Sequence, residues 1–101
     1  MKEILADFTK SIENLNEVLE IKKPGVAEEI VRDSAIKRFE ICFDLSWKLI
    51  KSYAKEQGSE CFSPRSCFKT GFQLNLIDYN EKWLKMIDDR NSTAHIYKEV
   101  Y

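Results

Sequence analysis

The chain has 101 residues, a net charge of -1 at pH 7, 44% hydrophobic residues and 33% charged residues. This length and composition predict one folded domain over residues 1–101 with a modest core, and they exclude an intrinsically disordered chain. Because basic and acidic side chains nearly balance, no overall positive field would attract nucleic acid, and any contact with RNA should be local.

The three cysteines, Cys42, Cys61 and Cys67, are odd in number and form no Cys-x-x-Cys pair. This pattern argues against a disulfide framework and against a zinc site, so we expect core cysteines, with Cys61 the one that could be exposed, and a reducing, cytoplasmic location. No apolar run approaches the ~20 residues that span a bilayer, and the first residues do not resemble a cleavable signal. We therefore expect neither secretion nor a membrane partner.

Apolar residues at three- and four-residue steps predict four helices, and no stretch shows the strict alternation typical of strands. The first helix is expected over residues 2–21 and ends at Lys-Lys-Pro-Gly, residues 22–25. The second runs from about residue 27 to residue 57 and stops at Gly58. At ~1.5 Å per residue it would be about 45 Å long, so we expect it to contact several neighbours, and a second subunit is one candidate.

The third helix is expected to begin with Ser63 as N-cap and Pro64 at the first helical position, and to run to about Leu76. Asp78 and Glu81 resemble a capping box that opens the fourth helix. Short connections between helices favour an all-α, antiparallel, up-and-down four-helix bundle. The residues of the third helix expected to face inward are Cys67, Phe68, Phe72 and Leu76.

Residues 88–97 contain the only histidine, His95, five positions after Arg90. On an unbroken helix the two positions would lie roughly 140° apart, whereas Arg90 and Tyr97 would share a face. Residues 91–93, Asn-Ser-Thr, are weak helix formers, so a helix could end or kink there. Such a break, or a second subunit, would bring Arg90 and His95 into one pocket.

The chemistry that such a pocket suits is cleavage of RNA by its own 2'-hydroxyl. Histidine, with an unperturbed pKa of ~6.5, can take or give a proton near neutral pH. Arginine supplies a permanent charge for the phosphate, which gains negative charge in the transition state. Neither a metal nor a cofactor is required. The competing interpretation is that Arg90 and His95 are surface or capping residues near a helix end.

Residues 90–97, Arg-Asn-Ser-Thr-Ala-His-Ile-Tyr, resemble the Arg-x4-His-x-Tyr motif of the HEPN toxins of HEPN/MNT toxin-antitoxin pairs, which are also described as nucleotidyltransferase substrate-binding proteins. The likeness continues through residues 38–48 and 63–65. The resemblance implies a HEPN-like bundle that forms a homodimer. It also implies a metal-independent endoribonuclease acting on tRNA or mRNA, with Arg90 and His95 as the catalytic pair.

The same resemblance implies that Asn91 orients this pair. It further implies that a minimal nucleotidyltransferase, the antitoxin, transfers AMP to Tyr97 and silences the toxin, because the added phosphate would block RNA. Members of the family usually continue with another helix beyond the tyrosine, so this bundle could lack a terminal helix. The alternative function is a non-catalytic subunit that binds a substrate or nucleotide for a minimal nucleotidyltransferase. A third possibility is a dimeric bundle with a degenerate site.

Four further charged positions invite a functional interpretation. Arg65 and Lys69 form a modest basic patch that could contact RNA phosphate, although a simple surface face is the competing interpretation. Glu40 and Asp44 could form a carboxylate pair, but Lys48 follows one turn later and favours a solvated row of ion pairs.

Overall fold

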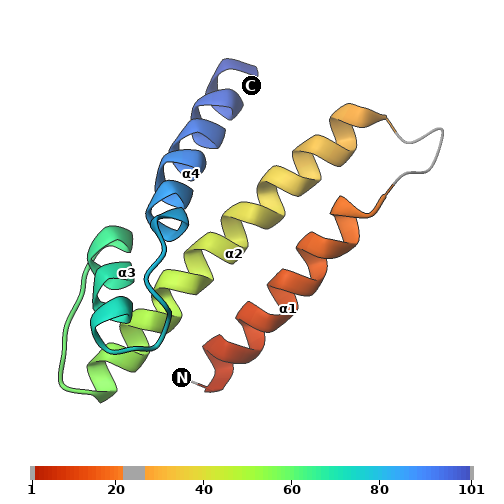
Figure 1. Ribbon diagram of the computed structural model, residues 1–101. Helices are drawn as coiled ribbons and strands as arrows, with labels where there is room; N and C mark the ends of the chain where they lie inside the picture. The colour runs from red at the N-terminus through yellow and green to blue at the C-terminus, as the bar shows by residue number, and fades with distance from the viewer. Residues whose placement is uncertain (1, 22–26, 101) are drawn as a thin grey trace.

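The computed structural model describes the backbone of residues 2–21 and 27–100, and the side chains of residues 2–21 and 27–93. Within these residues the chain forms four helices and no strand, so the expected all-α helical bundle is confirmed (Figure 1). The four helices are α1 (Lys2–Leu19), α2 (Glu28–Glu56), α3 (Pro64–Gln73) and α4 (Glu81–Val100).

The long helix α2 is the axis of the bundle. Helix α1 packs antiparallel along one side of α2, whereas α3 and α4 pack on the other side (Figure 1). Over the described ranges, α1 contacts neither α3 nor α4. The side chain of Arg38 attaches α2 to α1, because its guanidinium donates a 2.6 Å hydrogen bond to the Asn14 carbonyl and lies 4.0 Å from the Glu17 carboxylate. The expected contact of the second helix with several neighbours is therefore met within one chain.

The best-buried part of the core lies between α2, α3 and α4. The fully buried ring of Phe68 on α3 has its centroid 6.0 Å from that of Phe43 on α2 and 5.5 Å from that of Trp83 on α4. Gly71 faces Ile50 of α2 and leaves room for Ile77, since a Cβ at this position would lie 3.2 Å from Cγ1 of Ile77 and 3.4 Å from Cγ2 of Ile50. Because Phe68 faces Phe43 and Gly71 faces Ile50, α3 runs in the same direction as α2, so the expected antiparallel order does not hold between these two helices. Helix α4 then returns antiparallel to both (Figure 1).

Helix α3 ends earlier than the apolar pattern predicts. It stops at Gln73, not near Leu76, because Asn75 adopts a left-handed conformation with φ of 57°. The backbone then turns so that the Leu76 amide donates to the Gly71 carbonyl at 3.0 Å, an arrangement that terminates helices. Gly58, with φ of 79°, has the equivalent position after α2. As a result Leu76, expected to face inward, is 39% exposed.

The N-terminus of α3 was predicted correctly, whereas that of α4 was not. The Ser63 hydroxyl accepts from the Ser66 amide at 3.2 Å, and the Ser66 hydroxyl accepts from the Ser63 amide at 3.1 Å. These reciprocal bonds form a capping box. At α4, however, Oδ1 of Asn80 accepts from the Lys82 amide at 2.9 Å. Asn80 therefore caps α4, and the predicted box at residues 78–81 is wrong.

The connection between α2 and α3 carries a disulfide between Cys61 and Cys67. The argument against disulfides was wrong for this pair, because the connection places the Cα atoms only 5.1 Å apart across the first turn of α3. Cys61, which could have been exposed, is 3% exposed. Cys42 is a free, buried thiol, in agreement with its predicted place in the core.

The molecule is elongated, with extents of 51 × 27 × 22 Å and a radius of gyration of 15.3 Å. A compact domain of this length would have a radius of gyration of about 13 Å. The accessible surface is 7326 Å², against roughly 6,000 Å² for a compact monomer of 11.9 kDa. Part of this excess is apolar, because Leu5, Ile12 and Leu19 of α1 are exposed.

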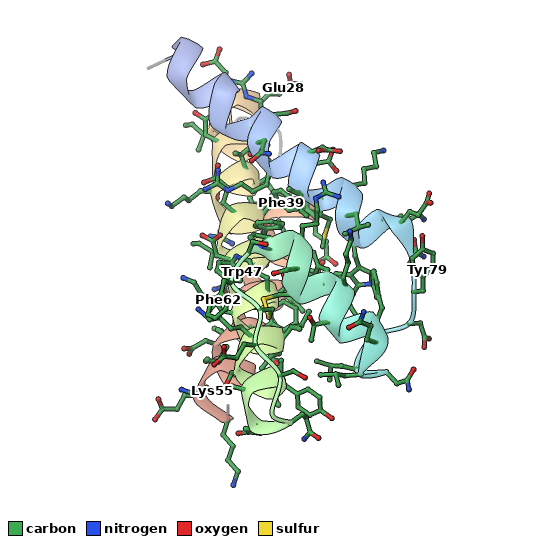
Figure 2. All side chains as sticks on the ribbon, turned by 90° about the vertical axis from the view of Figure 1, so that its left-hand side faces the viewer. Glu28, Phe39, Trp47, Lys55, Phe62 and Tyr79 are labelled. Carbon is green, nitrogen blue, oxygen red and sulfur yellow. A yellow bond between two sulfur atoms is a disulfide. The ribbon has the colours of Figure 1, made fainter. Side chains whose placement is uncertain are left out.

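Figure 2 shows the side of the molecule that carries α3 and α4. In this view Phe39, Trp47 and Lys55 follow one another along α2. Phe39 contacts Phe43, with ring centroids 6.4 Å apart, and Trp47 packs against the core. Tyr79 lies at the outer edge of the turn that leads into α4. Its ring packs edge-on against that of Phe72, with centroids 5.1 Å apart, so the turn is held against α3.

Candidate functional site

Helix α4 is continuous from Glu81 to Val100, so the break expected at residues 91–93 is absent. The Thr93 hydroxyl donates to the Arg90 carbonyl at 2.8 Å, within the helix. This bond uses the polar group of Thr93 without displacing the helix backbone, which explains why a weak helix former is tolerated. Positions 90 and 95 consequently lie about 140° apart around α4. A helix break or a second subunit could bring Arg90 and His95 into one pocket. Because the break is absent, only a second subunit remains.

Arg90 is half-buried on α4. Its guanidinium forms no ion pair or hydrogen bond with any side chain in residues 2–21 and 27–93. The neighbouring Asn91 is exposed. A guanidinium without a carboxylate partner can hold a phosphate through two parallel hydrogen bonds. The position of Arg90 therefore suits anion binding.

Glu40 of α2 contacts the same part of α4, a role that sequence reasoning missed. Its Oε1 lies 3.5 Å from the Thr93 hydroxyl, and its side chain is half-buried. The expected row of ion pairs is not formed, because Lys48 pairs with neither Glu40 nor Asp44 in the described part of the chain. Glu40 lies instead where α2 faces α4.

One feature of the sequence could have identified Glu40. That feature is its place beside the apolar seam. Phe39 occupies the step of the seam between Ile36 and Phe43, so Glu40 is the next residue toward the polar face of α2. A carboxylate at the edge of an apolar seam needs a polar partner if another helix covers it.

The backbone of α4 includes His95 and Tyr97, but their side chains lie outside the described residues. On a continuous helix, position 97 lies within about 20° of position 90, and position 95 lies within about 20° of positions 84 and 88. The motif therefore occupies two lines along α4. One line carries Arg90 and position 97, and the other continues from Leu84 and Asp88 to position 95.

A groove of about 500 Å³ lies between the start of α3 and the first half of α4. It brings Arg65 together with Lys82 and Lys85, two cations that sequence reasoning missed because they are distant from Arg65 in the chain. Lys69, predicted to act with Arg65, is exposed but does not line the groove. The other lining residues are Glu81, Leu84 and Asp88.

No group of three or more His, Cys, Asp or Glu side chains gathers as a potential metal site in the part of the chain that the structure describes. Within the same part, no helix combines the length and apolar character needed to cross a bilayer.

A family model described as nucleotidyltransferase substrate binding protein like matches residues 3–100. The match spans all four helices, and it includes both lines of α4 and the groove beside α3. No curated protein matches the chain.

Proposed function

The chain belongs to the nucleotidyltransferase substrate-binding-protein-like family, and from that premise we propose that it is the RNA-cleaving toxin of a HEPN/MNT toxin-antitoxin pair. One observation carries the proposal. Arg90, the first residue of the Arg-x4-His-x-Tyr motif, presents a half-buried guanidinium that has no partner in the described residues. A half-buried guanidinium without a partner can stabilise a phosphate that gains negative charge during the reaction.

The reaction is transfer of a phosphoryl group within RNA. The ribose 2'-oxygen attacks the adjacent phosphorus, a new P–O bond forms, and the bond to the 5'-oxygen breaks. His95 takes the proton from the 2'-hydroxyl or gives one to the leaving 5'-oxygen. Arg90 stabilises the charge on the phosphoryl oxygens, and Asn91 helps to orient the pair. The products are a 2',3'-cyclic phosphate and a free 5'-hydroxyl.

The active species is a homodimer, in which Arg90 of one copy faces His95 of the other. This arrangement satisfies the ~140° separation that an unbroken α4 imposes within one chain. The elongated shape supports it, since the accessible surface exceeds that of a compact monomer by about 1,300 Å². A stable interface of standard size buries roughly 800 Å² on each partner.

Tyr97 is the control point of this site. A partner nucleotidyltransferase directs the phenolic oxygen of Tyr97 to the α-phosphorus of ATP. The new P–O bond forms as the bond to pyrophosphate breaks, pyrophosphate leaves, and the phenol proton is released. Position 97 shares the α4 face of Arg90, so the attached phosphate would neutralise the guanidinium and exclude RNA. RNA, ATP and the nucleotidyltransferase partner place the protein in the cytoplasm, where the Cys61–Cys67 pair would be reduced.

A second candidate function is favoured by the family description, which names substrate binding and no cleavage. In that case the chain binds a substrate or nucleotide for a nucleotidyltransferase, and Arg90 holds a phosphate without any reaction. Both functions require the same partner enzyme. They differ in whether the purified chain cleaves RNA.

The discriminating experiment incubates the purified full chain with tRNA and with single-stranded RNA, without divalent metal, and identifies the product ends. Cleavage with 2',3'-cyclic phosphate ends is expected for the wild type and for Asn16→Ala, an exposed control on α1. His95→Ala should abolish cleavage without altering helix content by circular dichroism. Undiminished cleavage by His95→Ala would refute the catalytic assignment, and nucleotide binding without cleavage by the wild type would favour the second function.

A further inference from the structure

The groove between α3 and α4 has the size of a ligand site and is lined by several cations. Its volume of about 500 Å³ falls within the range of roughly 300–1,000 Å³ found for small-ligand sites. Arg65 contributes from the first turn of α3, and Lys82 and Lys85 contribute from α4. Three cations from two helices therefore converge on one concave surface.

The cations of the groove outnumber its carboxylates by three to two, so its lining has a net positive charge. Across residues 2–21 and 27–93, Arg65, Lys82 and Lys85 form no ion pair. Two carboxylates, Glu81 and Asp88, also line the groove but form no ion pair with these cations. A Glu81 oxygen instead accepts a hydrogen bond from the Tyr79 hydroxyl at 3.4 Å. The groove thus offers three free cations separated by two acidic positions.

One apolar residue, Leu84, also lines the groove, and it lies on the line of α4 that leads toward position 95. Leu84 is half-buried in the groove, and it can support the face of a base or ribose. Position 95 lies on the same line of α4 as Leu84, eleven residues further along, or roughly 16 Å away. A few nucleotides of extended single strand span that distance.

We propose that this groove binds the phosphate backbone of single-stranded RNA beside the cleavage site, an inference that rests on the proposed function. Lys82, Lys85 and Arg65 contact successive phosphates, while Leu84 supports a base or ribose. Because Glu81 and Asp88 lie among the cations, the groove favours phosphodiesters that each carry one negative charge and are spread along a strand. The same carboxylates repel the dense charge of a free triphosphate. The groove thereby selects an extended strand over a mononucleotide.

The test measures binding, so that it does not depend on cleavage. A full chain carrying His95→Ala is titrated with a labelled single-stranded RNA of about ten nucleotides over a series of salt concentrations. Lys82→Gln/Lys85→Gln is compared with Lys2→Gln/Lys10→Gln, which removes the same charge from α1 on the opposite side of α2. The groove variant should bind at least tenfold more weakly. Its salt slope should fall by about 1.4, since each phosphate contact on a single strand contributes about 0.7.

Arg65→Gln provides a second variant on another helix and should also weaken binding, so a folding defect in α4 alone cannot decide the outcome. Equal loss of binding in the groove and α1 variants, or no loss in the groove variants, would overturn the inference. Competition by ATP as strong as by the unlabelled oligonucleotide would overturn the preference for a strand and indicate a nucleotide site. Absence of cleavage by the wild type would count against the proposed function while leaving this binding result intact.

Discussion

The Thr93 hydroxyl lies 3.5 Å from Oε1 of Glu40, at the point where α4 crosses α2. The same hydroxyl lies 2.8 Å from the Arg90 carbonyl. Of these two contacts, only the longer one joins α4 to α2. Glu40 is therefore a weak polar contact of α2 with the turn of α4 that carries Arg90.

We predict a measurable but small coupling between these two residues. Glu40→Gln and Thr93→Val are compared singly and together by chemical denaturation. Because 3.5 Å is long for a hydrogen bond, the coupling free energy should be about 0.5–1 kcal/mol. Strictly additive effects on the free energy of unfolding would show that the contact does not form in solution.

Truncation of Phe68 should nearly unfold the bundle. Phe68 is 0% exposed and contacts rings on α2 and α4, so Phe68→Ala should lower the free energy of unfolding by about 3–5 kcal/mol. The matched control is Phe62→Ala, because Phe62 is 73% exposed. That change should remain within about 0.5 kcal/mol of the wild type. Similar losses in both variants would contradict the location of the core.

Reduction of the Cys61–Cys67 disulfide should lower stability modestly. The bond closes a short loop, with a sequence separation of 6, so its entropic contribution is about 2 kcal/mol. For a domain of this size, reduction should lower the melting temperature by roughly 10 °C. The Cys61→Ala/Cys67→Ala variant should not respond to reductant. If the wild type is equally insensitive, the bond does not form in solution.

Modification of Tyr97 should separate regulation from catalysis. Incubation with the partner nucleotidyltransferase and ATP should add the mass of one AMP per chain and stop RNA cleavage. Tyr97→Phe should remain unmodified and should keep cleaving RNA in the presence of that enzyme. Addition of AMP to Tyr97→Phe would place the modification at another residue.

Local patterns predicted most of the fold because helices depend on nearby residues. The spacing of apolar residues indicated all four helices, and Ser63 with Pro64 identified the start of α3. The end of α3 was missed because the apolar pattern continues to Leu76, whereas the left-handed backbone at Asn75 interrupts the helix. That conformation is compatible with asparagine but is not required by it.

Features that depend on how distant segments pack could not be predicted from the sequence. The Cys61–Cys67 bond forms because the connection after α2 folds back over the start of α3. Arg65 meets Lys82 and Lys85 only once α4 has packed beside α3. The roles of Arg90, Asn91, His95 and Tyr97 remain predictions that rest on the motif and the family.

The central claim, an active site shared by two copies with Arg90 from one and His95 from the other, is tested most directly by mixing two inactive variants. Arg90→Ala and His95→Ala are purified separately, mixed under conditions that allow subunit exchange, and assayed for RNA cleavage. In a mixed dimer one of the two sites regains both residues, so random exchange should restore about a quarter of wild-type activity. A mixture as inactive as either variant alone, despite demonstrated exchange, would contradict the account.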